Sequence, residues 1–509
     1  MSCFLSLSHI KFEYESSVKP LFSDLNIQFS HGWTGIIGAN GSGKTTLLKL
    51  LTGEVCPNSG IIRHSGLRSL CEQEIIQAPS NLNQLFDSYD SHAFELQNNL
   101  NLAFDMKDRW STLSMGERKK LQIAAALFKQ PDILCIDEPT NHLDTHGRRQ
   151  LALELSNFNG IGILVSHDRK LLDSLCSQCL FLEDNSQILR SGNYSACREL
   201  IILEHENNLK QCELLKRDIN RNKKELQRRR QKEQQAKNRD SKRKIAKKDH
   251  DAKSKIDAAR LTSRSRKSSD SAGKQAKKLN LLKSELNTFE KLKTINYKLQ
   301  ITYGCYSHKN ALLEFPARKI SLGPERHLSI PELVIGNKDR ISLSGKNGTG
   351  KSTLIMQIVK ELKLNHDEYI FLPQELNKSM TDRIYSTVQH LSHDDFSKVM
   401  NVVASLGSRP EQVMNTRSCS PGEWRKLFLG LGVLLPTCLI IMDEPTNHLD
   451  LPSIDCLENA LGECHCALLL ISHDLVFIHK LCSSHWFIKN TSKDENTLFK
   501  NFRTGGANT

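Results

Sequence analysis

The sequence predicts an α/β protein in which one α/β domain occurs twice and a long helical linker joins the two copies. Three observations predict this fold class: a set of motifs that repeats in one order, compact apolar runs typical of buried strands, and a central segment without proline. The expected domains are 1–195 and 301–509, and the expected linker is 196–300.

Four motifs establish the duplication. They are GANGSGKTTLL at 38–48, which recurs as GKNGTGKSTLI at 345–355; LSMGE at 113–117, which recurs as CSPGE at 419–423; DEPTNHLD at 137–144, which recurs unaltered at 443–450; and SHD at 166–168, which recurs at 472–474. The offset between the copies is 306 or 307 residues for every motif. Self-similarity of this kind indicates a duplicated domain.

Short apolar runs mark the strands that should carry these motifs. The runs at 33–37, 133–136 and 439–442 are compact and largely apolar, as expected of strands buried in a mostly parallel sheet. The glycine-rich motif follows such a run, and a helix is expected to open at its lysine, Lys44 in the first copy. This strand–loop–helix order is the context that a phosphate-binding glycine motif requires.

Both glycine-rich loops satisfy the pattern GxxxxGK[ST], whose backbone amides and helix N-terminus bind phosphate groups. The candidate nucleotide-binding residues are Gly38, Ala39, Asn40, Gly41, Ser42, Gly43, Lys44, Thr45 and Thr46 in the first copy, and Gly345, Lys346, Asn347, Gly348, Thr349, Gly350, Lys351, Ser352 and Thr353 in the second. Lys44 and Lys351 are expected to reach the β- and γ-phosphates, and Thr45 and Ser352 to ligate Mg²⁺. The expected cofactors are therefore ATP and Mg²⁺.

An acidic pair ends a predicted strand in each copy. Asp137 and Asp443 are placed to hold Mg²⁺, and Glu138 and Glu444 follow them directly, where a carboxylate can orient or deprotonate the attacking water. A surface acidic pair at a strand end is the plainer interpretation. The identical octapeptide in both copies favours the catalytic one.

With these residues the chain resembles the ATP-binding-cassette ATPases. LSMGE and CSPGE resemble the family's signature motif, and the SHD triplets resemble its switch histidines, His167 and His473. Gln73 and Gln374 resemble its Q-loop glutamines. The resemblance implies that the domains pair head to tail, so that Lys44 works with Ser420 and Gly422, and Lys351 with Ser114 and Gly116.

Two features are less regular. The second signature has Cys419 where the family has leucine and Pro421 in the variable place, although its serine and glycine remain, so both sites are expected to hydrolyse ATP. Tyr14 resembles the aromatic residue that stacks on adenine in the first domain, and Phe12 is an alternative. The second domain has no matching aromatic residue.

The linker carries all of the chain's net positive charge. Residues 210–293 contain 29 Lys and Arg against 11 Asp and Glu, a net charge of +18, whereas the whole chain has +13. Leucine and isoleucine occur near both ends of the linker, and LTSRSRKSSDSAG at 261–273 indicates a turn. We therefore expect an antiparallel helical hairpin with a basic tip. A flexible basic tether is the alternative.

The tandem cassettes, EPTNHLD, GNYS at 192–195 and the charged linker together resemble the ABC-F family. That resemblance implies a factor that binds the exit-tRNA site of the ribosome, contacts rRNA and tRNA through its linker, and relieves stalling or protects from antibiotics. The basic linker suits a phosphate backbone. The linker from 196 to 288 has no aromatic residue, which argues against base stacking on single strands.

Two other functions compete with this interpretation. A fused ATPase subunit of an importer also has tandem cassettes, but the long basic linker has no evident use beneath a permease. A DNA-repair or chromosome ATPase carries its coiled coil inside a cassette, whereas here only 70 and 69 residues separate each P-loop lysine from its signature serine. No secretory signal or membrane span is evident, so we expect a cytoplasmic monomer whose cassettes pair within the chain.

Overall fold

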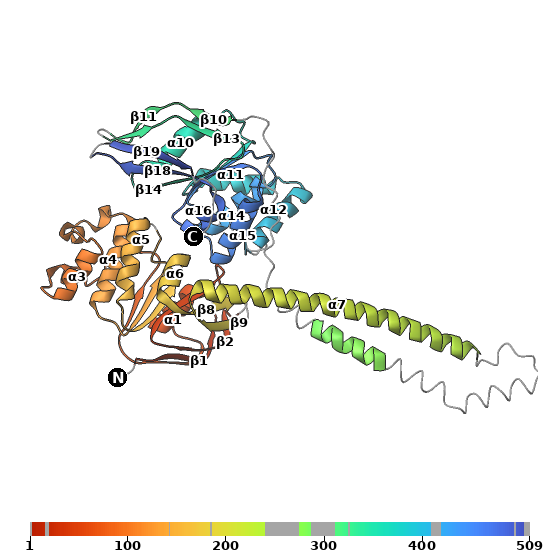
Figure 1. The fold of residues 1–509 in the computed structure, drawn as a ribbon. Helices are drawn as coiled ribbons and strands as arrows, with labels where there is room; N and C mark the ends of the chain where they lie inside the picture. The colour runs from red at the N-terminus through yellow and green to blue at the C-terminus, as the bar shows by residue number, and fades with distance from the viewer. Residues whose placement is uncertain are drawn as a thin grey trace, which may run out of the picture. The chain divides into compact units, whose positions relative to one another are not determined.

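The computed structural model describes residues 3–15, 20–141, 143–183, 186–239, 274–286, 311–323, 326–408, 419–492 and 495–502. Contacts divide the chain into two units, one made of Met1–Cys197 and Tyr297–Thr509 and the other of Arg198–Asn296. The first unit contains both α/β domains, and the second contains most of the linker (Figure 1). The middle of the linker, including the turn expected at 261–273, lies outside the described residues.

The first α/β domain alternates strands and helices. Its elements are β1 (Leu5–Phe12), β2 (Phe22–Phe29), β3 (Gly32–Gly38), α1 (Lys44–Thr52), β4 (Ser59–His64), β5 (Arg68–Cys71), α2 (Leu82–Asp87), α3 (Ser91–Asn99), η1 (Phe104–Lys107), η2 (Trp110–Thr112), α4 (Met115–Phe128), β6 (Ile133–Asp137), α5 (Thr145–Ser156), β7 (Ile161–Val165), α6 (Arg169–Leu175), β8 (Cys176–Glu183) and β9 (Ser186–Ser191).

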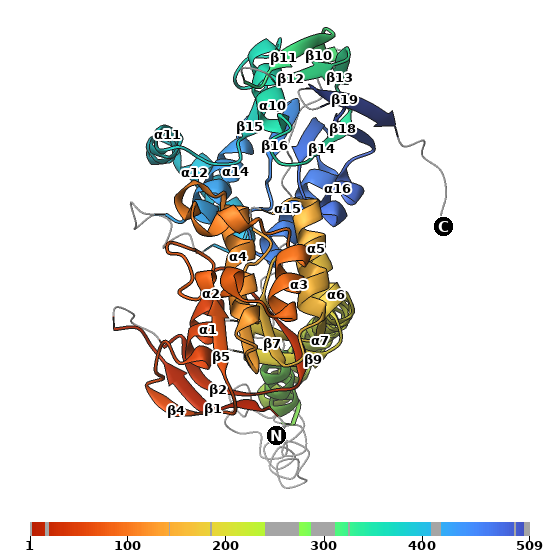
Figure 2. The ribbon, with the colours of Figure 1, turned by 90° about the vertical axis from the view of Figure 1, so that its left-hand side faces the viewer.

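Two sheets build this domain. The six-stranded sheet has the order β5-β6-β7-β3-β8-β9, in which the pairs from β5 to β8 are parallel and β9 is antiparallel. A three-stranded antiparallel sheet, β2-β1-β4, forms a separate layer (Figure 2). The run expected at 133–136 is the fully buried strand β6, because helices cover both faces of a parallel sheet.

The second α/β domain repeats this plan. Its elements are β10 (Ala311–Phe315), β11 (Arg318–Ser321), β12 (His327–Ile330), β13 (Leu333–Gly336), β14 (Arg340–Gly345), α10 (Lys351–Glu361), β15 (Tyr369–Leu372), α11 (Lys378–Gln389), α12 (His393–Ser405), α14 (Pro421–Gly432), β16 (Leu439–Asp443), α15 (Leu451–Glu463), β17 (Ala467–Ile471), α16 (Leu475–Leu481), β18 (Ser484–Asn490) and β19 (Glu495–Phe502). The main sheet has the order β11-β12-β19-β18-β14-β17-β16-β15, and β10 pairs with β13.

The order of the central strands is the same in both domains. β5-β6-β7-β3-β8 in the first corresponds to β15-β16-β17-β14-β18 in the second, and all of these pairs are parallel. The strand that precedes each glycine-rich loop therefore lies at the centre of its sheet. The structure confirms the predicted α/β fold class, with a helical insert between the two domains.

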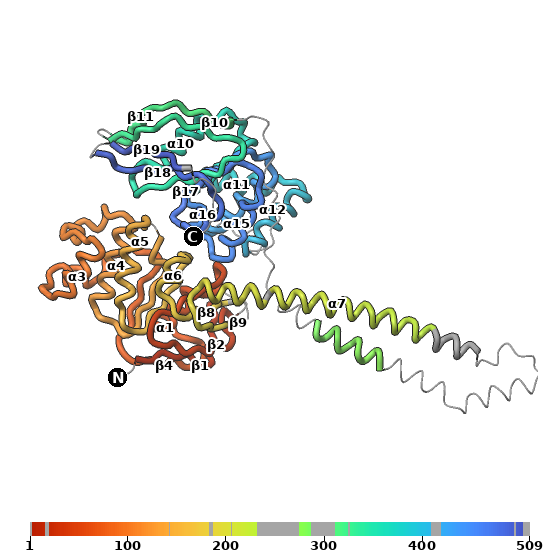
Figure 3. Tube along the Cα trace, viewed as in Figure 1, coloured from red at the N-terminus to blue at the C-terminus, as the bar shows by residue number. Residues whose placement is uncertain are grey.

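The described linker is helical. α7 (Tyr194–Arg239) begins the linker, and a second helix at 274–286 packs beside it (Figure 3). Ile219 and Leu226 of α7 form a small apolar cluster with Leu279, and Gln275 donates hydrogen bonds to Asn222 and Glu225 at 2.7 and 3.2 Å. These contacts hold α7 and the helix at 274–286 together. No described helix is long and apolar enough to cross a membrane.

The cysteines belong to the interior. In the described residues every cysteine is a free thiol, and most are buried, including both members of the close pairs Cys176/Cys179 and Cys464/Cys466. No group of three or more His, Cys, Asp or Glu suited to a metal ion occurs among the described residues. The cysteines therefore serve as small core residues in this fold.

Candidate active sites

The first glycine-rich loop connects the end of β3 to the start of α1. Gly41 and Gly43 have φ angles of 80° and 94°, which L side chains rarely adopt, so the loop can curl around the N-terminus of α1. Lys44 folds back over this curl and donates hydrogen bonds to the carbonyl oxygens of Gly38 and Ala39, at 2.9 and 3.0 Å. Burial lowers the pKa of Lys44, while carboxylates nearby oppose that change.

The second loop repeats this geometry between β14 and α10. Gly348 and Gly350 have φ angles of 75° and 98°, and Lys351 donates to the carbonyl oxygens of Gly345 and Lys346 at 2.7 and 3.2 Å. In each loop an ammonium group lies on carbonyl oxygens beside a helix N-terminus. That arrangement favours an anion, and a phosphate group is the anion that this loop shape fits.

A hydroxyl group and a carboxylate meet beside each loop. Thr45 Oγ1 donates to Asp137 Oδ2 at 2.6 Å, and Ser352 Oγ donates to Asp443 Oδ2 at 2.8 Å. Burial raises the pKa of both aspartates, and the hydroxyl groups partly offset this. Oxygen ligands of these two kinds are those that Mg²⁺ prefers, so the residues present fit the ion expected here.

Glu138 and Glu444 have strained backbones at the ends of β6 and β16. Their φ angles are 47° and 50°, a region that residues other than glycine rarely occupy and that is enriched at functional sites. Their side chains are almost fully buried, and burial raises the pKa of Glu138 to about 8 and that of Glu444 to about 7. In the part of the chain that the structure describes, Oε1 of each glutamate accepts no hydrogen bond.

The two switch histidines lie against these glutamates. The backbone amide of His167 donates to Glu138 Oε2 at 3.3 Å, and that of His473 donates to Glu444 Oε2 at 3.2 Å. The Nε2 to Oε1 separations are 3.1 and 3.5 Å. Burial lowers the pKa of His167 to about 3 and that of His473 to about 4, so both imidazoles are neutral near pH 7.

Each signature serine begins a helix. Ser114 caps α4 and Ser420 caps α14, and each forms a capping box with the glutamate three residues later, Glu117 or Glu423. Pro421, the unusual residue in the second signature, occupies the first turn of α14. A backbone N–H at this position would have no partner within the helix, so proline costs no hydrogen bond there. The departure from the family pattern therefore leaves the helix N-terminus intact.

The first loop faces the second signature. The backbone amide of Asn40 donates to Asp450 Oδ2 at 2.6 Å, and Asn40 Nδ2 donates to the carbonyl oxygen of His448 at 3.1 Å. A β-carbon added at Gly422 would lie 3.6 Å from Asn40 Nδ2. Residues of the first glycine-rich loop thus meet the DEPTNHLD segment and the signature glycine of the second domain in one composite arrangement, called site I below.

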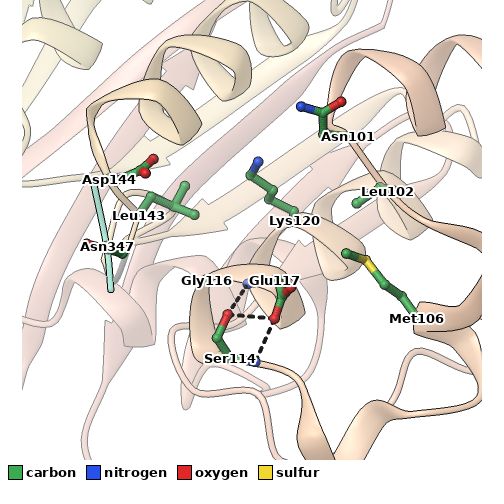
Figure 4. A pocket seen from close by; sticks show the side chains of 10 residues that line it. All are labelled: Asn101, Leu102, Met106, Ser114, Gly116, Glu117, Lys120, Leu143, Asp144 and Asn347. Atoms are coloured by element: carbon green, nitrogen blue, oxygen red, sulfur yellow. Dashed lines mark hydrogen bonds between the residues drawn. The ribbon is translucent and has the colours of Figure 1, made fainter. Parts of the chain in front are cut away.

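The second loop faces the first signature across a cleft of about 210 Å³. Figure 4 shows its lining, in which Ser114 and Gly116 at the start of α4 lie on one side and Asn347 lies beside Asp144 on another. The remaining lining residues are Asn101, Leu102, Met106, Glu117, Lys120 and Leu143. This second composite arrangement is called site II below.

The remaining expected residues lie at the edges of these sites. Gln73 and Gln374 are exposed in the loops after β5 and β15. The Tyr14 hydroxyl lies 2.8 Å from Thr46 Oγ1 in α1, and its ring is about half exposed, whereas Phe12 is buried in the core. Of the two aromatic candidates, only Tyr14 is thus available to a ligand at the first loop.

Two buried basic residues escaped the sequence analysis. Lys119 in α4 donates to the carbonyl oxygens of Glu72 and Asp137, at 2.6 and 2.8 Å. Arg425, which lies 306 residues later in α14, donates to the carbonyl oxygens of Gln374 and Glu444. Each joins the Q-loop to the end of the strand that carries the acidic pair. Their recurrence at the repeat offset was the signal that could have revealed them.

Comparison with known proteins matches both halves to one family. The family model described as ABC transporter matches residues 22–141 and 328–447. The chain is a tandem ATP-binding-cassette protein of the ABC-F type. Domains of this family bind nucleotide, typically with Mg²⁺, and in general hydrolyse ATP. The two α/β domains are accordingly called cassettes 1 and 2 from here on.

Several curated proteins resemble nearly the whole ABC-F chain. The ribosome protection protein VmlR of Bacillus subtilis is 28% identical over 94% of this chain and 85% of its own length. The ATP-binding protein Uup of Buchnera aphidicola is 26% identical over 89% of this chain and 76% of its own length. Among solved structures, archaeal ribosome recycling factor aABCE1, in complex with the ribosomal stalk protein aP1, has a TM-score of 0.58 at 15% identity, covering 96% of this chain and 89% of that one. This last likeness concerns the fold.

Proposed function

We propose that the chain is an ATPase that binds and hydrolyses ATP at both composite sites. The head-to-tail contact between Asn40 and Asp450 supports this proposal, because it joins the glycine loop of cassette 1 to the DEPTNHLD segment of cassette 2, next to the signature glycine Gly422. In this proposal Lys44 and Lys351 hold the β- and γ-phosphates. Ser114, Gly116, Ser420 and Gly422 present helix N-termini to the γ-phosphate from the opposite cassette.

The polar groups beside each loop have separate roles in this proposal. Thr45 with Asp137, and Ser352 with Asp443, would hold Mg²⁺, which neutralises the charge of the phosphates. Glu138 and Glu444 each have a buried oxygen without a hydrogen bond among the described residues, and that oxygen would accept a proton from the attacking water. His167 and His473 are neutral, so their Nε2 atoms can donate to the γ-phosphate when they carry the proton.

We further propose that this ATPase acts on the ribosome as a cytoplasmic translation factor. The alignment with a ribosome protection protein over 94% of the chain supports the class of partner. The linker, with a net charge of +18 between residues 210 and 293, supports contact with the phosphate backbone of rRNA and tRNA. Relief of stalled translation or protection from ribosome-targeting antibiotics would be the outcome of that binding.

Co-sedimentation tests the ribosome proposal. The variant with Glu138→Gln and Glu444→Gln should bind ATP without hydrolysing it, and should migrate with ribosomes only when ATP is present. The matched control carries Lys44→Ala and Lys351→Ala and should not migrate with them. A second pair of changes, Arg228→Gln and Arg230→Gln on the exposed surface of α7, should lower the affinity more at low than at high salt, because the variant releases fewer counterions. Failure to migrate under every condition would favour a membrane permease as partner.

A further inference from the structure

The two composite sites differ at the cassette interface. In site I, Asp450 of cassette 2 accepts the hydrogen bond from the backbone amide of Asn40. In site II, the equivalent residues are Asp144 of cassette 1 and Asn347 of cassette 2, which line the cleft of about 210 Å³. No hydrogen bond joins that second pair in the described part of the chain. The residues that follow these two aspartates differ as well.

Arg148 lies one helical turn after Asp144, in α5 of cassette 1. Its Nη1 atom is 3.0 Å from Asp168 Oδ2, and its Nε atom donates to the carbonyl oxygen of Leu143 at 3.1 Å. Only 17% of the Arg148 side chain and 13% of the Asp168 side chain are exposed, so water screens this ion pair little. Asp168 is the last residue of the SHD triplet of cassette 1. The ion pair therefore fixes the guanidinium group between the start of α5 and this triplet.

The same turn of α5 also reaches site II. Thr145 Oγ1 lies 3.4 Å from Nδ1 of His473, the switch histidine of cassette 2. Burial is the main influence on the pKa of Glu444 and on that of His473, and the charge of Arg148 is the next largest for both. The first turn of α5, which the ion pair of Arg148 ties to Asp168, thus contacts the switch histidine of site II through Thr145.

Site I has no equivalent of this arginine. The residue 306 positions after Arg148 is Ile454, which is 1% exposed and belongs to the apolar core. Charges of cassette 1 act on the pKa of Glu138, whereas Asp450 and Lys426 of cassette 2 act on the pKa of His167. Ile454, however, cannot form with Asp474 the ion pair that Arg148 forms with Asp168.

The residue after Asp168 is anchored to the opposite cassette. Arg169 is 4% exposed, and its Nη1 and Nη2 atoms lie 2.8 and 2.7 Å from carboxylate oxygens of Glu458 and Asp455 in α15. The equivalent of Arg169 in cassette 2 is Leu475, which cannot form such pairs. Asp168 therefore lies beside two anchored arginines: Arg148, which forms an ion pair with it, and Arg169, which pairs with Asp455 and Glu458 of cassette 2.

We propose that Arg148 is a positioning residue that couples the switch triplet of site I to hydrolysis in site II, with no counterpart in the reverse direction. The inference rests on the proposed hydrolysis of ATP at both sites. When His167 engages a γ-phosphate, the Asp168 beside it is fixed in place, and Arg148 is fixed with it. Through the carbonyl oxygen of Leu143 the guanidinium group then holds the start of α5, and so keeps Thr145 against His473 in the arrangement that hydrolysis in site II requires.

Rapid mixing of the full chain, loaded with two ATP per molecule, tests the coupling. In Arg148→Ala we expect one phosphate to form at the unaltered rate and the other about tenfold more slowly, within the range typical of coupled sites. Asp168→Asn removes the negative partner of the same ion pair while the side chain keeps almost the same size, and it should produce the same slow phase. Arg149→Ala, an exposed arginine next in the same helix, is the matched control and should change neither phase.

The slow phase is then assigned to a site. Adding Lys351→Ala to Arg148→Ala should remove the slow phase, and adding Lys44→Ala should remove the fast one. Equal slowing of both phases in Arg148→Ala, or no slowing at all, would overturn the coupling while leaving the proposed hydrolysis intact. If the unaltered chain formed no phosphate, the proposed hydrolysis would be wrong and the coupling would fall with it.

Discussion

The backbone amide of Asn40 in cassette 1 donates a 2.6 Å hydrogen bond to Asp450 Oδ2 in cassette 2. The two residues are 410 positions apart in the chain. Asp450 is fully buried, and it also accepts hydrogen bonds at the start of α15 from the backbone amide and the hydroxyl group of Ser453. Although burial raises its pKa, the charge of Lys426 and these hydrogen bonds hold the pKa of Asp450 below its usual range. A buried anion thus helps to close site I.

Replacing Asp450 with alanine should weaken this closure. The change would leave Lys426 buried without its carboxylate, and breaking a buried ion pair typically costs about 3–5 kcal/mol. We expect a lower free energy of unfolding and a higher ATP concentration for half-maximal hydrolysis. Asp450→Asn is the matched control, since its amide oxygen can still accept from Asn40. Chemical denaturation and steady-state kinetics measure the two effects, and equal losses in both variants would argue against the hydrogen bond.

Removing both buried glutamates should separate ATP binding from turnover. Glu138→Gln and Glu444→Gln keep the size of the side chain and abolish its ability to take a proton. Loss of a general base typically lowers the rate by about 10²–10⁴-fold, while binding of a fluorescent ATP analogue should stay within about twofold of the parent. Phosphate release gives the turnover. Undiminished release in the double variant would mean that other groups activate the water.

The same two glutamates should make the stability of the nucleotide-free chain depend on pH. Their pKa values are raised from 4.5 to about 8 for Glu138 and about 7 for Glu444, so the folded chain binds more protons than the unfolded chain between these limits. Their contribution to stability is complete below pH 4.5 and is lost as the pH rises through 7 and 8. Each group should lower the free energy of unfolding by at most about 1.4 kcal/mol per pH unit.

A comparison of variants isolates this effect from other titrating groups. The double Glu→Gln variant cannot ionise at these two positions, so its melting temperature should rise relative to that of the unaltered chain as the pH goes from 6 to about 8. Differential scanning fluorimetry without nucleotide measures both proteins. Parallel melting curves across this range would mean that the glutamates ionise normally in the folded state.

Much of the candidate sites could be predicted from sequence because their chemistry is local. The glycine loop, its lysine and the following hydroxyl residue lie within eight positions, and each Glu directly follows the Asp that ends a buried strand. Apolar runs and glycine spacing fix these local arrangements. The likeness of the copies then implied the second site from the first.

The contacts between separate elements, within and between the cassettes, could not be predicted in this way. Lys119 and Arg425 looked like ordinary charged helix positions, and only the fold shows that they reach buried carbonyl oxygens. Arg148 and Ile454 are a difference between the two copies, whereas the repeated motifs consist of identities. Such contacts depend on which faces of the elements meet, and that is settled by packing between residues from 18 to 410 positions apart.

Arg169 should hold the cassettes together more strongly than any nearby surface charge. It joins Asp455 and Glu458 across the interface, and Lys480 also pairs with Glu458 at 2.6 Å. Arg169→Ala would remove the cation from between two carboxylates, so we expect a loss of roughly 3–5 kcal/mol in the free energy of unfolding. Salt screens an ion pair only where water reaches it, and the Arg169 side chain is only 4% exposed. We therefore expect the same loss of stability in high salt.

Two controls separate the ion cluster from general damage to α6. Lys170→Ala changes an exposed cation next to Arg169 and should alter the free energy of unfolding by less than about 0.5 kcal/mol. Adding Asp455→Asn to Arg169→Ala should cost less than the sum of the single changes, because both remove the same ion pair. Denaturation midpoints of the four proteins complete the cycle. Additive losses would show that Arg169 stabilises the chain through packing in cassette 1 and not through the opposite cassette.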